Sequence, residues 1–326
     1  MFPPKLRRGD TVRVVAPSRS RSMVTEHDHT ALIEQRFAAL GLRLTYGAHV
    51  DERDDFDSSP VASRLADLHE AFADPDVAAI MTVIGGFNSH ELLPHLDWAL
   101  VAAHPKVLCG YSDITALQNA ILARTGLVTY SGPHWSTFGM RDHLQQTLDW
   151  FEAALFSDEP LELTASSSWT DDLWFLDQDD RHPQPNEGWW ALRPGSAAGR
   201  IVGGNLCTFN LLQGGPYRPS LEGALLVVED DALTFPAQLA RDLTSLLQLP
   251  DAAGITGVVV GRFQGASGLT RDLLAQIVER AGLPFGVPVL ANVDVGHTHP
   301  LMTLPIGGRA ELVVDGGRAH FRLTQH

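Results

Sequence analysis

The 326-residue sequence predicts an α/β fold that begins with a doubly wound, mostly parallel sheet. Two observations carry this prediction. Short, fully apolar runs typical of buried strands alternate with segments whose apolar residues recur at helical spacing. Glycines and small polar residues then follow the apolar runs directly, as at Gly85-Gly86 and Ser112. In such sheets, ligands bind beyond the carboxyl ends of the strands, so these positions are candidates for a site.

The expected elements of the first half alternate regularly. We expect strands at residues 11–16, 42–46, 77–84, 107–109 and 127–130, and helices at 30–40, 63–72, 91–96, 114–126 and 142–156. Gly41 and Gly126 are placed to end two of these helices. We therefore assign residues 1–160 to an N-terminal domain.

Short strands separated by glycine turns resume near residue 199. Strands are expected at residues 199–205, 224–229, 255–260 and 288–292, helices at 235–247 and 267–281, and a β-rich end at 310–323. We assign residues 199–326 to a β-rich C-terminal α/β domain.

The stretch between the two domains, residues 161–198, is rich in Ser, Asp, Pro and Trp. It holds Trp169, Trp174, Trp189 and Trp190, four of the seven tryptophans of the chain. Long irregular segments in compact proteins are usually linkers or functional loops. Two interpretations stay open: a loop whose tryptophans contact a substrate, or aromatic packing at the domain junction.

Composition restricts the partners. With 24 basic and 39 acidic residues, the net charge is −15 and the isoelectric point is near 5.3. Such a surface repels phosphate backbones and anionic lipids, so nucleic-acid polymers and membranes are poor candidates. The chain shows no signal-peptide pattern and no apolar run of about 18 residues, from which we expect a cytoplasmic protein. Cys109 and Cys207 are expected to be buried free thiols.

Residues 107–126 are typical of a strand, a sharp turn and a helix, with Ser112 at the turn. A serine in this position has its hydroxyl above the sheet and near the first amides of the helix, which is the geometry of a nucleophile elbow. Gly110 matches the G-x-S-x-G pattern, but Ile114 replaces its second glycine. The alternative is that Ser112 or Asp113 only caps the helix.

Glu229 and His297 also follow apolar strands directly. A nucleophilic serine needs a base, and a histidine base needs a carboxylate that fixes its tautomer and stabilises its cation. Ser112, Glu229 and His297 satisfy that requirement in composition. Their convergence in space cannot be read from the pattern, and other histidines, His90, His134 and His299 among them, stay open as alternatives.

Several separate motifs resemble the LD-carboxypeptidase family of serine peptidases, in order and over nearly the whole chain. The resemblance is greatest to the microcin C immunity branch, whose members act on peptidyl-nucleotide antibiotics. The motifs lie at residues 84–89, 92–93, 110–113, 185–190, 201–206, 212–214, 228–231, 261–263 and 292–298.

The resemblance implies a role for each candidate. Ser112 would be the nucleophile, His297 the general base and acid, and Glu229 the orienting carboxylate. The amides of Gly86 and Asp113 would form the oxyanion hole. It also implies a flavodoxin-like first domain, a swivelling second domain that carries Glu229 and His297, no cofactor, and a homodimer.

No metal is expected, because His297 and His299 have no third or fourth ligand nearby in sequence.

The resemblance implies amide hydrolysis through an acyl-enzyme, and the tryptophan-rich segment favours an aminoacyl- or peptidyl-nucleotide as substrate. A muropeptide and an inactive binding module are the alternatives. An aminoacyl- or peptidyl-nucleotide needs an aromatic surface for its base, which Trp174, Trp189 or Trp190 could supply. A muropeptide with a terminal D-amino acid instead needs a cation for its carboxylate. The resemblance also makes Asn88, Ser89 and Asn205 candidates for contact with the substrate. The third possibility is an inactive nucleotide-binding module that cradles phosphate at Gly85-Gly86 or Gly203-Gly204.

Overall fold

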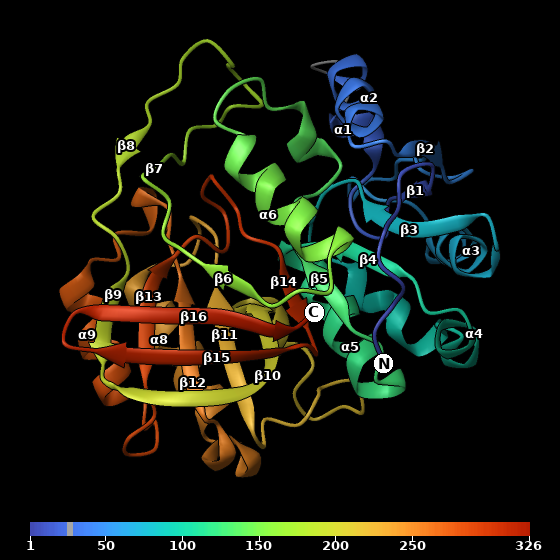
Figure 1. The fold of residues 1–326 in the computed structure, drawn as a ribbon. Helices are drawn as coiled ribbons and strands as arrows, with labels where there is room; N and C mark the ends of the chain where they lie inside the picture. The colour runs from blue at the N-terminus through green and yellow to red at the C-terminus, as the bar shows by residue number, and fades with distance from the viewer. Residues whose placement is uncertain (25–28) are drawn as a thin grey trace.

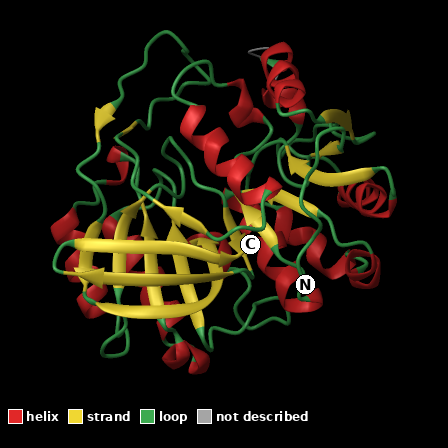
Figure 2. Cartoon of the chain, in the orientation of Figure 1, coloured by secondary structure: helices red, strands yellow, loops and turns green. Residues whose placement is uncertain are grey.

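The computed structural model describes residues 1–24 and 29–326. Its two large β-sheets lie side by side, with helices around each of them (Figures 1 and 2). The N-terminal sheet has six strands and the C-terminal sheet has eight. The expectation of an α/β fold with a parallel first sheet and a β-rich second part is confirmed.

The first sheet has the strand order β14-β5-β4-β3-β1-β2. Its parallel strands are β1 (Thr11–Val15), β2 (Arg43–Tyr46), β3 (Val77–Thr82), β4 (Val107–Gly110) and β5 (Thr129–Ser131). Their order, 2-1-3-4-5, is that of flavodoxin-like sheets, in which the strand order reverses between β1 and β3. The sixth strand, β14 (Leu304–Ile306), comes from near the end of the chain and pairs antiparallel with β5.

Helices connect the strands of the first sheet much as the apolar spacing predicts. The α-helices are α1 (Arg21–Val24), α2 (Thr30–Ala39), α3 (Val61–Ala73), α4 (Trp98–Ala103), α5 (Thr115–Thr125) and α6 (Gln145–Phe156), and the 3-10 helices are η1 (Ser89–His95), η2 (Ser112–Ile114) and η3 (Ser136–Gly139). Gly126 ends α5 in the left-handed conformation, with φ = 75°. The helix expected at 91–96 is 3-10 and contains Pro94, which has no N–H for an α-helical bond.

The second sheet has the order β6-β16-β15-β10-β11-β12-β13-β9. Its centre is parallel: β10 (Gly195–Asn205), β11 (Ala224–Glu229), β12 (Gly257–Gly261) and β13 (Val289–Val293). The antiparallel strands are β6 (Leu161–Leu163), β9 (Trp190–Arg193), β15 (Arg309–Asp315) and β16 (Arg318–Gln325). The helices of this region are α7 (Leu206–Asn210), α8 (Pro236–Leu247), α9 (Arg271–Arg280), η4 (Pro250–Gly254) and η5 (Gly265–Ser267). The expected helix at 267–281 begins only at Arg271, where the Thr270 side chain caps it.

The tryptophan-rich segment is more ordered than its composition predicts. Its two ends form β6 and β9 and belong to the second sheet, while β7 (Ser168–Trp169) and β8 (Gln184–Pro185) pair with each other. The division of the chain at residues 160 and 199 stays a prediction.

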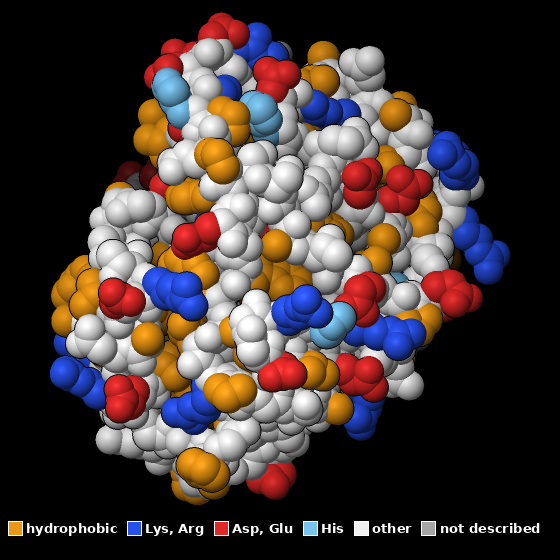
Figure 3. Space-filling model, turned by 60° about the vertical axis from the view of Figure 1, so that its left-hand side comes forward, with side chains coloured by type: hydrophobic (Ala, Val, Ile, Leu, Met, Phe, Trp, Pro, Cys, Tyr) orange, Lys and Arg blue, Asp and Glu red, His pale blue; other side chains and the backbone are white. Residues whose placement is uncertain are grey.

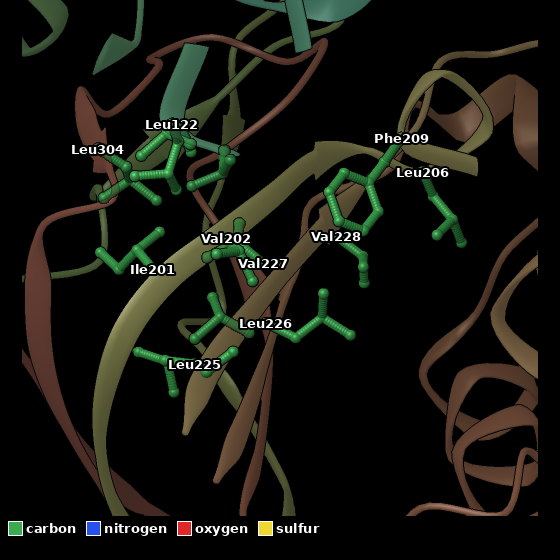
Figure 4. Close-up of a cluster of buried hydrophobic side chains, with 14 of the residues drawn as sticks. Leu122, Ile201, Val202, Leu206, Phe209, Leu225, Leu226, Val227, Val228 and Leu304 are labelled. Atoms are coloured by element: carbon green, nitrogen blue, oxygen red, sulfur yellow. The ribbon is translucent and has the colours of Figure 1, made fainter. Parts of the chain in front are cut away.

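One hydrophobic cluster spans the two large sheets, and a second cluster belongs to the first sheet alone. Figure 4 shows Leu122 of α5 and Leu304 of β14 beside Ile201 of β10, and these side chains belong to one buried cluster. Polar contacts reinforce this junction: the Asn119 amide donates to the carbonyl of Gly203 at 2.8 Å, and the Gly203 N–H donates back at 3.1 Å. The core therefore fixes how the two domains face each other.

The thiol prediction is half correct. Cys109 is buried in β4, but Cys207 is exposed. Cys207 lies in the first turn of the short helix α7, whose buried side is formed by Leu206, Thr208 and Phe209.

In the described part of the chain, no helix has the length and apolar character needed to cross a membrane. The face in Figure 3 carries acidic and basic side chains interspersed, so the acidic excess is not gathered into one region there.

Candidate active site

The structure brings together three side chains that are far apart in sequence. Ser112 follows β4, Glu229 ends β11, and His297 lies in the connection between β13 and β14. His297 Nε2 is 3.0 Å from Ser112 Oγ, and His297 Nδ1 is 2.8 Å from Glu229 Oε2. These distances are those of hydrogen bonds, so a continuous chain runs from hydroxyl to imidazole to carboxylate.

Ser112 is held in a left-handed backbone conformation, with φ = 60°, which is uncommon for a residue with a side chain. Its neighbours must be small for the turn to fit. A Cβ on Gly85 would lie 2.9 Å from Ser112 Cβ, and a Cβ on Gly110 would collide with Thr82 Oγ1. Ile114, in contrast, is fully buried with φ = −64°, so the second elbow glycine is not needed here.

Glu229 is enclosed by two further glycines. The carboxylate is 2% exposed; a Cβ on Gly296 would approach Glu229 Oε2 to 2.6 Å, and one on Gly261 would lie 2.8 Å from Glu229 Cβ. Gly296 also has φ = 110°, which favours glycine. The residue before His297 therefore lets the backbone fold tightly around the carboxylate that the imidazole contacts.

Charge controls the protonation of His297. Burial alone lowers its pKa, but the charge and hydrogen bond of Glu229, together with Asp231 and Asp230, outweigh burial and raise the pKa above its ordinary value. The carboxylates therefore favour the imidazolium form of this residue.

His134 lies behind the imidazole and behaves in the opposite way. Burial and the nearby His297 lower its pKa to about 3, so it stays neutral. Its Nδ1 is 2.7 Å from Thr82 Oγ1, and its ring is 4.4 Å from that of Tyr111, which in turn meets the His297 ring edge-on at 5.2 Å. Tyr111 and His134 thus form a fixed aromatic support for the histidine of the triad.

The two amides predicted as oxyanion donors lie beside Ser112. Gly86 lines the cavity above the serine, and no described residue accepts a hydrogen bond from its amide. A side chain at Gly86, where φ is 158°, would collide with Ser18 Oγ. The Asp113 amide belongs to η2, the turn that begins the helical segment after Ser112.

The Asp113 side chain fastens the loops around the serine. Asp113 Oδ2 accepts hydrogen bonds from Ser18 Oγ at 2.6 Å and from the Ser89 amide at 2.9 Å, and Ser89 Oγ donates to the Asp113 carbonyl at 2.7 Å. These bonds join the segments that follow β1, β3 and β4. Ser18 was not among the predicted site residues, although its place just after the first strand was a usable signal.

A cavity of about 240 Å³ opens over Ser112 and His297. It is also lined by Gly85, Gly86, Tyr111, His134, Asp231, Gln264 and His299, and by residues 171–175 of the tryptophan-rich segment. An adjoining, mainly apolar cavity of about 230 Å³ shares Arg19, Ile84, Ser136, Trp174 and Phe175 with it. The two cavities adjoin at these shared residues, and we treat them as two compartments of the candidate site, one over Ser112 and one mainly apolar.

Of the six residues predicted to contact the substrate, Trp174 alone lines this site. Trp190 lines a separate cavity of about 580 Å³ and donates to Glu187, and Trp189 lies against Phe321 of the second sheet.

The three polar candidates have structural contacts instead. Ser89 holds Asp113, Asn205 caps α7, and Asn88 Oδ1 is 3.5 Å from the hydroxyls of Ser18 and Ser58.

No group of three His, Cys, Asp or Glu side chains suited to a metal ion occurs in residues 1–24 and 29–326. The absence of a metal and of a cofactor stays a prediction.

Comparisons with known proteins agree with the motifs. The chain matches the models of the LD-carboxypeptidase N-terminal domain over residues 12–132 and the LD-carboxypeptidase C-terminal domain over residues 198–312. It is 45% identical to the putative carboxypeptidase YocD of Bacillus subtilis over the full length of both chains. It is 30% identical to the murein tetrapeptide carboxypeptidase of Pseudomonas aeruginosa over 85% of each.

Solved structures extend the likeness to the whole fold. An MccF-like protein from Bacillus anthracis superimposes with a TM-score of 0.97 at 43% identity, covering all of both chains. The microcin C7 self-immunity protein MccF, in complex with aspartyl sulfamoyl adenosine, superimposes with a TM-score of 0.87 at 28% identity, covering 100% of this chain and 99% of the other. With two family domains in sequence and a fold shared over its full length, this chain belongs to the LD-carboxypeptidase family.

Proposed function

We propose that the protein is a serine hydrolase that cleaves an amide bond through an acyl-enzyme. One observation carries this proposal: the hydrogen-bonded chain from Ser112 through His297 to Glu229, with the serine on a strained turn. Such an arrangement supplies a nucleophile, a base and an orienting acid in one place.

The proposed reaction has two stages. Ser112 Oγ attacks the amide carbonyl carbon while His297 Nε2 takes the hydroxyl proton, and the amides of Gly86 and Asp113 donate to the oxyanion. The C–N bond then breaks, and the amine leaves with the proton from His297. Water, deprotonated by His297, hydrolyses the ester and restores Ser112. Each oxyanion donor in such sites typically contributes about 10²–10³-fold in rate.

The preferred substrate is an aminoacyl- or peptidyl-nucleotide. Its acyl carbonyl would lie at Ser112, and its nucleoside would extend into the apolar compartment that Trp174 and Phe175 line. Base–aromatic stacking is worth about 1–3 kcal/mol per base, which makes such a compartment suitable for a nucleoside. The aspartyl sulfamoyl adenosine bound to MccF, a relative of the same fold, has this chemistry.

A muropeptide with a terminal D-amino acid is the second candidate. Arg19 lines both compartments and could hold a terminal carboxylate, and a murein tetrapeptide carboxypeptidase is among the relatives.

An inactive nucleotide-binding module is disfavoured, because it would have no use for a hydrogen-bonded serine, histidine and glutamate. Cytoplasmic location and a homodimer stay predictions.

Two measurements test the proposal. A fluorophosphonate probe is expected to label Ser112 in the folded protein and to fail with Ser112→Ala. An aminoacyl sulfamoyl-adenosine and an L,D-linked tetrapeptide are then assayed side by side. Cleavage of the tetrapeptide alone would overturn the nucleotide substrate, and absence of an adduct on Ser112 would overturn the hydrolase itself.

A further inference from the structure

Arg19 is the one Lys or Arg among the described residues that line the cavity over the triad. It follows β1, at the point where the strand order of the first sheet reverses. The other charged side chains that line this cavity, apart from its histidines, are the acids Asp171, Asp172 and Asp231. The proposed reaction of Ser112, His297 and Glu229 gives no role to this single guanidinium among acidic side chains.

The guanidinium of Arg19 lacks the partners that other shielded arginines have. Arg64 pairs with Glu91 at 2.6 Å and Arg262 with Asp294 at 2.7 Å. No described carboxylate pairs with Arg19, and its Nε is buried without a hydrogen-bond partner. A buried donor left unsatisfied costs stability, so a ligand that accepts from it would recover that cost.

The side chain is also held in place. Arg19 Cζ lies 5.0 Å from the centroid of the Phe87 ring, a distance typical of a cation–π contact, and Phe87 is itself 65% exposed. The Arg19 amide donates to the carbonyl of Gly85 at 3.3 Å, and a Cβ on Gly86 would lie 2.9 Å from Arg19 Cγ. The aliphatic stem therefore lies against the glycine whose amide is the proposed oxyanion donor.

These contacts define the order of groups along a substrate. A carbonyl oxygen at the Gly86 amide lies next to the stem of Arg19, and the apolar compartment begins at Arg19 and Trp174. A leaving amine that extends from Ser112 towards the residues that the two cavities share therefore comes close to Arg19.

We propose that Arg19 determines specificity by binding an anionic group carried on the leaving amine, one or two atoms from the nitrogen that departs. This inference rests on the proposed function and adds the class of leaving group to it. The shared chemistry is an anionic oxygen that accepts from a planar guanidinium. It is a carboxylate or phosphoryl oxygen, or a sulfonyl oxygen of an acylsulfamate, whose acidic N–H is ionised and shares its charge with the sulfonyl group. A nucleotide and a terminal amino acid both supply such an oxygen.

The test compares anionic leaving groups with neutral ones. In one arm, an L,D-linked tetrapeptide is compared with its C-terminal carboxamide. In the other, an aminoacyl sulfamoyl-adenosine is compared with the same aminoacyl group on 5′-amino-5′-deoxyadenosine, which keeps the base but lacks the sulfonyl group. The natural leaving group belongs to the pair in which the wild type has a high kcat/KM and strongly prefers the anionic substrate. It is a terminal amino acid if that pair is the tetrapeptides, and a nucleotide if that pair is the adenosine compounds.

The variant Arg19→Gln is expected to lower kcat/KM for the anionic substrate of that arm about ten- to hundredfold, with a loss of less than about threefold for its neutral partner. Arg19→Lys keeps the positive charge but loses the planar guanidinium. Its kcat/KM for the anionic substrate is expected to lie between those of the wild type and Arg19→Gln. Arg124→Gln is the matched control, because Arg124 lies over the Trp98 ring at 5.8 Å but does not line the site. It is expected to behave as the wild type.

Equal losses on the anionic and neutral substrates would overturn the role of Arg19, and so would an Arg19→Gln enzyme that keeps the full preference. Labelling of Ser112 by the fluorophosphonate separates this result from failure of the proposed function. If the wild type is labelled on Ser112 and active but does not prefer the anionic substrate, only the inference about Arg19 is refuted. If the wild type is not labelled on Ser112, the proposed hydrolase function is refuted. Thermal unfolding of Arg19→Gln shows whether any loss of label comes from misfolding.

Discussion

The two halves of the candidate site are built in different ways. Ser112 is held by contacts within the first sheet: a left-handed backbone, the glycines at 85 and 110, and the Asp113 carboxylate. The base half has no such local origin. Glu229 comes from the end of β11, and His297 lies on the connection that leaves the second sheet at β13 and enters the first at β14.

This difference shows what sets the distance between nucleophile and base. The serine is preorganised by its own domain, but its separation from His297 depends on how the domains pack. β14 pairs with β5, the strand beside the one that leads into Ser112. The connection that carries His297 is therefore fastened to the sheet that leads into Ser112. The predictions below test whether the two halves act as one unit.

Removing either end of the hydrogen-bonded chain is expected to have the largest effect. Ser112→Ala and His297→Ala should each lower kcat by about 10⁴-fold or more, because neither residue can act without the other. The double variant should be no worse than the single ones. Steady-state kinetics, with circular dichroism as a check on folding, measures all three. Turnover by Ser112→Ala near the wild-type level would refute the assignment, and additive losses would show that the halves act separately.

Glu229→Gln is expected to cost somewhat less, about 10³–10⁴-fold, since the serine and histidine remain. It should also change the pH profile. The base must be neutral to work, and Glu229 contributes to the raised pKa of His297, so wild-type activity falls as pH drops through a pKa above the ordinary value. With the charge removed, that pKa falls and the acidic limb should move to lower pH. If the acidic limb of the pH–activity profile of Glu229→Gln stays at the wild-type pH, a group other than His297 controls that limb.

Gly86→Ala tests the nucleophile half alone and is expected to lower kcat about 10²–10³-fold. The added methyl group would collide with Ser18 Oγ in a backbone conformation that favours glycine, which would displace an oxyanion donor. Gly215→Ala is the matched control, because the nearest atom to its added Cβ is 3.7 Å away and its φ is not positive. The pH profile of Gly86→Ala should keep its wild-type position, since the base half is untouched. A displaced profile, or an equal loss in Gly215→Ala, would count against this role.

Much of the fold was predictable because parallel strands read as continuous apolar runs, and strand ends therefore mark the edge where a site forms. Ser112, Glu229 and His297 all stand at such ends. Composition could not choose among the histidines, and the structure explains why: His134 and His299 line the same cavity as His297. Contacts with Ser112 and Glu229, 185 and 68 positions away in sequence, distinguish His297 from the other two, and the family motifs supplied that information.

The substrate contacts could not be predicted in the same way. Trp189 and Trp190 are adjacent, and their directions depend on β9 pairing with β13, a contact across nearly 100 residues that apolar spacing does not reveal. Asn205 and Ser89 were candidates through the family resemblance alone, and in the structure they hydrogen-bond to buried backbone groups and to the Asp113 and Asp230 carboxylates. Arg19 was missed because a charged residue in a loop carries no periodic signal. Arg19 comes to line the cavity over Ser112 only because β1 and β3 lie side by side in the sheet.

The smallest expected effect comes from the junction itself. Asn119 on α5 makes two hydrogen bonds to the backbone of Gly203 on β10, and Asn119→Ala would leave both buried groups unpaired. We expect a loss of about 2–4 kcal/mol in the free energy of unfolding and a decrease in kcat of about tenfold, as the base half shifts relative to Ser112. Denaturant titration and steady-state kinetics measure the two. Asn210→Ala is the control: Asn210 donates to the Asp242 carbonyl within the second domain, so its loss should cost about 1 kcal/mol and leave kcat unaltered. If Asn119→Ala were destabilised but fully active, the packing of α5 on β10 would not set the distance from His297 to Ser112, and β14 would be left as the element that aligns the two halves.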